Sequence, residues 1–261
     1  KSQLGTADVV KQGGTYRVYA NVTDAGSGVS RVRANVSTIT PGQTSVSLSL
    51  GSWSVRGVTY NYRSGQLTAT NPLAPGAKSF SVTATDVAGN ATGSTGSAAV
   101  DNTGPFASDV QVRNTSGLTA GKADNGDTLT LTYSEPIEPE SIVSGWDGAT
   151  MTVTVRIQNQ GAGDLVQVRN AANSSSIPAG SVLLPGTAYV SATVSFSNST
   201  MTMSGSTLVL VLGTPNLPAM VGTVAVAGTM TYTPVASMYD RAANACGTAA
   251  VSETGALDVE F

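Results

Sequence analysis

Apolar and polar positions alternate along the chain in short segments. The clearest is Ser79–Asn90, with the sequence SFSVTATDVAGN, in which apolar residues alternate with Ser and Thr. This period of two predicts a β-strand with one buried face. Asp86 ends the alternation, and the Gly-Asn pair that follows has the chemistry of a tight turn. A similar sequence, Tyr239–Asn244, recurs near the C-terminus, so we expect two copies of one kind of module.

The same pattern predicts further strands and no long helix, with at most one helical turn over Glu138–Ser144. Short strands separated by turns every 8–12 residues or so are typical of a β-sandwich. Before residue 103 we expect strands at Thr15–Asp24, Val29–Val36, Ser45–Leu50, Trp53–Tyr62, Ser79–Asp86 and Ala99–Asp101. After it we expect Ser108–Asn114, Thr128–Ser134, Met151–Gln158, Asp164–Val168, Tyr189–Phe196, Thr207–Leu212, Val221–Tyr232 and Leu257–Phe261.

A boundary between two domains is expected at Asn102–Pro105, because a Gly-Pro pair cannot continue a strand ladder and small polar residues precede it. The pattern therefore predicts an all-β protein with domains at residues 1–103 and 104–261. The second domain is larger than a minimal sandwich, so it is expected to carry insertions.

Composition excludes several classes of function. Charged residues make up 11% of the chain and the net charge is −3, with no Lys/Arg cluster that could neutralise nucleic-acid phosphates. The chain contains no run of 18 apolar residues, so no transmembrane segment is predicted. The chain has no His and one Cys, Cys246, which excludes a Ser-His-Asp triad, an intrachain disulfide and a multi-Cys zinc site. Its start at Lys1 rather than Met is expected either for a processed N-terminus or for an excised fragment, and a removed secretion signal is the preferred interpretation.

Two stretches, residues 15–36 and 82–90, resemble bacterial immunoglobulin-like modules of secreted and surface proteins. In that family an Asp-x-x-Ser-Gly-Val turn joins two early strands and an Asp-x-Ala-Gly-Asn turn joins the last two. Residues 122–136, KADNGDTLTLTYSEP, resemble the opening strands of a related domain in surface-layer and cell-wall proteins. The matching positions are Asp24, Ser27, Gly28 and Val29 for the first turn, Asp86, Ala88, Gly89 and Asn90 for the second, and Asp240 and Asn244 for the late copy.

The late copy departs from the family at Ala243, where Gly is expected. The resemblance implies two tandem immunoglobulin-like β-sandwiches, the second larger with insertions. It also implies an extracellular location and a role as a spacer, an adhesion module or an assembly module. The same fold hosts unrelated activities, so the resemblance does not name a partner.

One candidate metal site is the crowded acidic turn formed by Asp124, Asn125 and Asp127. Calcium prefers six to eight oxygen ligands, often from carboxylates and carbonyls in turns. The alternative is that these residues cap backbone amides of the turn, as Asp and Asn commonly do. Apart from this calcium, no cofactor is expected.

Trp53, Tyr60 and Tyr62 are candidates for a carbohydrate-binding surface. Aromatic rings on one sheet face can stack on the apolar faces of sugars. The alternative is that these rings fill the core, because only 5% of the residues are aromatic.

Acid/base chemistry has only a weak candidate in Glu135, Glu138 and Glu140. Glycoside hydrolysis needs two carboxylates that face a sugar cleft. These three lie around two prolines at a strand end, where solvated loop carboxylates are expected. We therefore expect no enzyme.

The sequence thus favours a non-enzymatic extracellular structural or adhesive module, including a repeating subunit of a surface filament or layer. The expected partners are other proteins, among them further copies of the chain and cell-surface components. A terminal segment could add to a neighbour's open sheet edge. The residues expected to do so are Val9, Val10, Leu257, Val259 and Phe261. The alternative function is a carbohydrate-binding module of a secreted protein.

Overall fold

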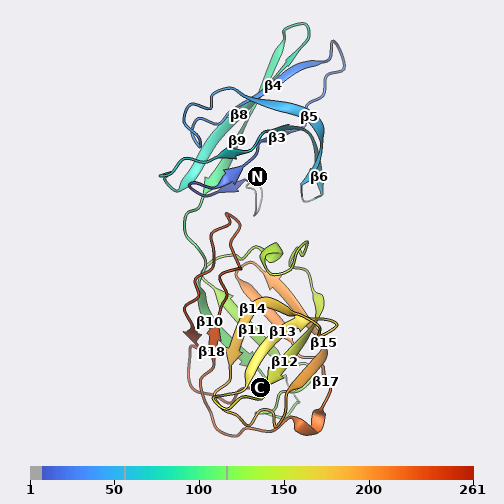
Figure 1. Cartoon of the computed structure of the whole chain (residues 1–261), viewed down its shortest axis with the longest axis vertical. Helices are drawn as coiled ribbons and strands as arrows, with labels where there is room; N and C mark the ends of the chain where they lie inside the picture. Colours follow the sequence, from blue (N-terminus) through green and yellow to red (C-terminus); the bar gives the residue numbers. More distant parts are fainter. Residues whose placement is uncertain (1–7, 56, 116) are drawn as a thin grey trace. The chain divides into compact units, whose positions relative to one another are not determined.

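The computed structural model describes residues 8–55, 57–115 and 117–261. Its regular structure is almost entirely β-strand, and the described helices are two 3-10 turns, Pro139–Ser141 and Pro218–Met220. The predicted all-β class is therefore confirmed. The first unit holds residues 1–103 with Arg241–Asn244, and the second holds Gly104–Asp240 and Ala245–Phe261 (Figure 1). Within the part of the chain that is described, no helix has the length and hydropathy needed to cross a membrane.

The first unit is built on a seven-stranded sheet in the order β1-β9-β8-β4-β5-β6-β3. Neighbours are antiparallel except for β1, which runs parallel to β9, and the short strands β2 and β7 pair separately. The bounds are β1 Val9–Val10, β2 Thr15–Tyr16, β3 Tyr19–Ala20, β4 Val29–Asn35, β5 Val46–Val55, β6 Val58–Ser64, β7 Leu67–Thr68, β8 Gly76–Asp86 and β9 Ala91–Val100.

One apolar core lies inside this unit and takes residues from both ends of the sheet. Val10 and Ala98 come from β1 and β9, and Tyr62 comes from β6. The long strand β5 shifts register against β6 between Leu50 and Trp53, and such a bulge bends a strand. The sheet therefore curls around its core in a sandwich-like arrangement.

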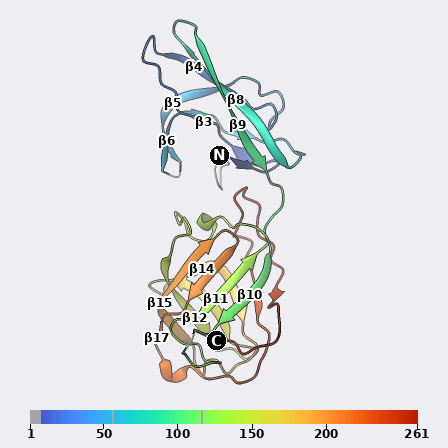
Figure 2. The same ribbon diagram turned by 180° about the vertical axis from the view of Figure 1, so that it is seen from behind.

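The second unit is built on a larger sheet in the order β10-β11-β16-β15-β12-β13-β14-β18-β19, with β17 paired to β15 (Figure 2). All of its strand pairs are antiparallel. The bounds are β10 Ala107–Arg113, β11 Thr128–Tyr133, β12 Met151–Gln158, β13 Leu165–Asn170, β14 Ser176–Leu183, β15 Val194–Ser204, β16 Thr207–Val211, β17 Thr214–Pro215, β18 Thr231–Thr233 and β19 Val251–Ser252.

This second sheet curls until its two ends meet. β10 lies against β18 and β19 (Figure 1). The Gln111 side-chain amide donates to the Thr254 carbonyl at 2.8 Å, and the Asp109 carboxylate accepts from the Thr254 amide at 2.9 Å. The enclosed core is separate from that of the first unit. Its fully buried residues include Val153, Val155, Ile157, Phe196 and Leu208.

The predicted strands differ from the observed ones where the chain is not simply alternating. Thr15–Asp24 divides into β2 and β3, and β9 begins at Ala91 although its Ser/Thr/Gly-rich sequence predicted a strand only from Ala99. β14 was not predicted at all. Leu257–Phe261 is not a strand: only Asp258 forms an isolated bridge, with Gly228. Of Val221–Tyr232, only the end lies in β18.

The two Asp-x-Ala-x-Asn segments adopt related backbone conformations. In the first, the Asp86 carboxylate accepts from the Asn90 amide at 2.7 Å and from its side-chain nitrogen at 2.8 Å. These bonds favour the ionised form, and the side-chain bond is the largest cause that lowers the pKa of Asp86. Gly89 has a φ of 94°, and Ala243 at the corresponding late position has a φ of 68°. The Ala therefore occupies a left-handed position that normally favours glycine.

Candidate functional sites

A groove of about 610 Å³ opens in the first unit between residues 19–24 and the strands β8 and β9. Tyr19, Tyr60 and Phe80 supply aromatic surface to its wall, and the centroids of the two tyrosine rings lie 5.5 Å apart. Polar side chains line the rest, among them Asp24 and Asn90. Rings flanked by hydrogen-bonding groups are the surface that a sugar or an extended peptide can use.

Phe80 takes its position because its cross-strand neighbour on β9 has no side chain. Phe80 pairs with Gly96, and a Cβ atom built on Gly96 would lie 2.5 Å from the tip of the Phe80 ring. The ring therefore covers the glycine.

The three aromatic residues predicted to bind sugar lie in different environments. Tyr60 lines the groove, whereas Tyr62 is 8% exposed and belongs to the core. The Arg63 guanidinium lies 4.6 Å above the Trp53 ring, in cation–π geometry. Of the three, Tyr60 is the one with a place in the groove. A sugar-binding role for Trp53, Tyr60 and Tyr62 stays a prediction.

The outer edge of β9 is the most extended bare backbone that we find in the described part of the first unit. The inner edge pairs with β8 from Ala91 to Val100. On the outer edge, β1 pairs only with Ala99 and Val100, and no described strand pairs with Ala91–Ala98. Unpaired amides and carbonyls on such an edge can template the addition of another strand.

The alternation of the strand shows which groups face outward. The Ala99 amide donates to the Asp8 carbonyl at 2.8 Å on the β1 side. Successive residues of a strand present their backbone groups to opposite edges. The amides and carbonyls of Gly93, Thr95 and Ser97 therefore point to the open edge. Their neighbours point to β8.

The terminal residues predicted to drive assembly are mostly packed into their own units. Val9 pairs with Ala99, and Val10 is 4% exposed in the first core. Phe261 is 1% exposed and Val259 is half-buried in the second unit, whereas Leu257 is 67% exposed. An assembly that used the packed residues would have to release them first. Their role in assembly stays a prediction.

The carboxylates of the acidic turn have protein partners. Asp127 is buried, and its two oxygens accept from the amides of Thr115 and Asp124, each at 2.8 Å. Burial raises the pKa of Asp127 despite these bonds. Asp124 pairs with the Lys122 ammonium at 3.3 Å, and Asn125 is exposed. These are the contacts of residues that order a turn, and the calcium site stays a prediction.

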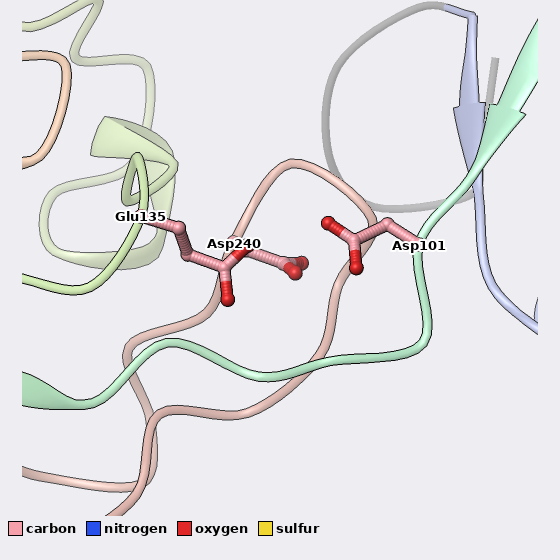
Figure 3. A group of neighbouring side chains, drawn as sticks. All are labelled: Asp101, Glu135 and Asp240. Atoms are coloured by element: carbon pink, nitrogen blue, oxygen red, sulfur yellow. The ribbon is translucent and has the colours of Figure 1, made fainter. Parts of the chain in front are cut away.

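Glu138 was expected to be a solvated loop carboxylate, and this is wrong: its side chain is completely buried. Pro139 and the short helix that follows fold the segment inward, whereas Glu140 remains exposed. Glu135 and the buried Asp240 bring carboxylate oxygens within 4.8 Å of each other in the second unit. Figure 3 draws these two with Asp101, which belongs to the first unit.

The sequence analysis missed a second group of acids in the second unit, Glu253, Asp258 and Glu260, which the fold brings together. No motif connects them: Glu253 lies outside every predicted strand, whereas Asp258 and Glu260 lie within the predicted strand Leu257–Phe261. Glu260 is only 1% exposed. This burial could not be expected from the sequence, because acidic residues are mostly exposed and Asp258, two positions away, is exposed.

The buried nucleophilic groups of the second unit are held in unreactive forms. The hydroxyls of Tyr133 and Tyr232 lie 2.8 Å apart, and Tyr232 donates to the Ala179 carbonyl at 2.9 Å. Cys246 is 3% exposed, and burial raises its pKa to about 11. A thiol in that state is a poor nucleophile at neutral pH.

Comparison with known proteins does not assign a family. No protein-family model matches the chain, and no curated protein matches it significantly.

Proposed function

We propose that this chain is a non-enzymatic extracellular module that builds or adheres to a surface structure through the open edge of β9. The observation that carries the proposal is the outer edge of Ala91–Ala98, with which no described strand pairs. The motif resemblance supports the finer fold, two tandem immunoglobulin-like sandwiches with insertions in the second. The same resemblance supports an extracellular, bacterial setting.

The partner that we propose for this edge is an extended segment of a second copy of the chain. β1 already joins the edge in parallel at Ala99 and Val100, so a further strand can continue the same ladder. The exposed residues along this edge are Ser, Thr, Gly and Ala; none of them is charged, so they neither repel a partner nor block its approach. Repetition of this contact would make the chain a repeating subunit of a surface filament or layer.

A proline substitution tests the edge. Thr95→Pro removes an amide that points outward and leaves the β8 pairing intact, because proline is tolerated where the missing N–H faces solvent. Sedimentation of the full chain over a range of concentrations is expected to show self-association that Thr95→Pro abolishes. The matched control Thr95→Ala keeps the amide and is expected to associate like the wild type.

Two results would contradict this proposal. One is a full chain that stays strictly monomeric over the whole range of concentrations. The other is measurable turnover of an ester, glycoside or peptide by the pure chain, which would refute the non-enzymatic part.

The groove favours a second candidate function, a carbohydrate-binding module. Its support is the place of Tyr60 beside Tyr19 in the groove wall. Retention on insoluble polysaccharides is expected to fall with Tyr60→Ala and to persist with Trp53→Ala, which lies outside the groove. Equal retention of wild type and Tyr60→Ala would remove this site.

A further inference from the structure

Three acidic side chains converge near the end of the second unit. Oxygens of Glu253, Asp258 and Glu260 all lie within 4.8 Å of one another. Glu253 directly follows β19, and its amide donates to the Met230 carbonyl at 3.0 Å. The Asp258 carbonyl accepts from the Gly228 amide at 2.9 Å. Backbone bonds to other loops therefore fix the segments that carry the three carboxylates.

Glu260 is the unusual member of this group. Its side chain is 1% exposed, and apart from the neighbouring Glu253 carboxyl group neither of its oxygens has a hydrogen-bond partner among the described residues. Burying an ionised carboxylate in such a position is strongly unfavourable unless another charge compensates it. Asp258 is exposed and Glu253 is half-buried, so the group leads from solvent to the buried oxygens.

The Tyr189 hydroxyl is a second buried oxygen without a partner among the described residues. The Tyr189 side chain is fully buried, and its ring lies 6.1 Å from the ring of Phe261, the residue after Glu260. Burial raises the pKa of Tyr189, and the Glu260 charge is the largest further cause. The Glu260 carboxylate therefore lies within electrostatic range of the phenol.

The charges around Glu260 have one sign. The groups that act on it are Glu253 and Asp258, both acidic, and within the described ranges no Lys or Arg forms an ion pair with any of the three. Glu253 and Asp258 therefore add negative charge beside the buried Glu260 carboxylate. A proton shared between Glu260 and Glu253 would neutralise one charge of three. A divalent cation would neutralise two of the three charges, and the buried oxygens would serve as its ligands.

We propose that Glu253, Asp258 and Glu260 form a calcium site in the second unit. The ligands are all oxygens, as a hard cation requires, and the chain has no His that would favour softer metals. Calcium accepts irregular geometry with six to eight ligands, and water can complete the set on the exposed Asp258 side. This site is separate from the turn at Asp124–Asp127.

Terbium luminescence tests the proposal, because a tyrosine close to a bound lanthanide sensitises its emission. The full chain, stripped with a chelator, is titrated with Tb³⁺, and Ca²⁺ then competes. We expect saturable sensitised emission that Ca²⁺ displaces. Glu260→Gln keeps the size of the side chain and removes its charge, so affinity is expected to fall at least about tenfold. Tyr189→Phe removes the buried phenol and is expected to weaken the sensitised emission.

Two controls separate this site from other acids. Glu140→Gln makes the same chemical change at an exposed position and is expected to bind like the wild type. Asp124→Asn is expected to do so as well, and loss of binding in that variant would overturn the assignment by placing the ion at the turn. Circular dichroism checks that each variant is folded. If Glu260→Gln does not fold, the exposed Asp258→Asn takes its place with the same expectation.

Absence of Tb³⁺ or Ca²⁺ binding by the wild type overturns the proposal. So does binding that neither Glu260→Gln nor Asp258→Asn weakens. A Glu260→Gln chain that melts higher than the wild type while neither responds to Ca²⁺ would show that a shared proton occupies the group instead.

Discussion

Single residues in left-handed conformations shape the turns that end the strands in this protein. Gly89 and Ala243 occupy the same position of two related turns, with φ values of 94° and 68°. Only the glycine adopts this conformation without steric cost, because the Cβ of other residues approaches the following carbonyl. The late turn therefore keeps the conformation of the first at a local energetic cost.

Exchange of the two residue types should have opposite effects. Gly89→Ala is expected to lower the free energy of unfolding by about 1 kcal/mol. Ala243→Gly relieves the same strain and is expected to leave stability equal or slightly higher. Urea unfolding of the full chain measures both. A similar loss in both variants would contradict the account of these turns.

The buried thiol gives a residue-scale prediction of pH dependence. Burial raises the pKa of Cys246 from 9.0 to about 11, so folding favours the thiol over the thiolate. This contribution is complete below pH 9 and disappears as the pH rises toward 11. We expect native protein to resist thiol reagents at neutral pH, and Cys246→Ala to lessen the loss of stability between pH 9 and 11. Rapid labelling of the native chain would contradict this.

At the scale of elements, alternation predicted the strands that bury side chains and missed those held by backbone bonds. β8 was predicted because Phe80, Val82 and Ala84 alternate with polar residues. The first part of β9 was not, because its sequence ATGSTGSA has no apolar period. Its hydrogen bonds to β8 do not depend on side chains, and the Phe80 ring supplies the cover that Gly96 lacks.

β14 shows why a glycine can be required inside a strand. Gly180 has a φ of 79°, and a Cβ there would lie 2.4 Å from the Thr233 carbonyl oxygen of the neighbouring strand β18. Gly180→Ala combines backbone strain with overpacking, so it is expected to cost about 2–4 kcal/mol. Urea unfolding measures the change. A loss below that of Gly89→Ala would show that the strands separate easily here.

The candidate sites were less predictable than the strands. Leu257–Phe261 was predicted to be a strand, with Leu257, Val259 and Phe261 available to a neighbouring molecule, but the segment is not a strand. Leu257 is exposed, and the consecutive residues Glu260 and Phe261 are both buried. Turn acids such as Asp127 could be found from the local sequence alone. Whether their oxygens face amides or each other depends on contacts distant in the sequence.

At the scale of the whole molecule, the chain has two separate apolar cores. Leu48→Ala in the first core and Leu208→Ala in the second are each expected to cost about 2–5 kcal/mol. Because no described residue belongs to both cores, each substitution should lower the thermal transition of its own unit more than that of the other. Scanning calorimetry of the full chain measures this. Equal shifts of one common transition would contradict the division.

Amide hydrogen exchange along β9 tests the central claim most directly. In dilute solution we expect the amides of Gly93, Thr95 and Ser97 to exchange quickly, and those of Ser94, Gly96 and Ala98 to be protected by β8. As the protein concentration rises, the first three should become protected as well. Outward amides that are already protected in the dilute monomer, or that stay unprotected at every concentration, would contradict an edge built to receive another strand.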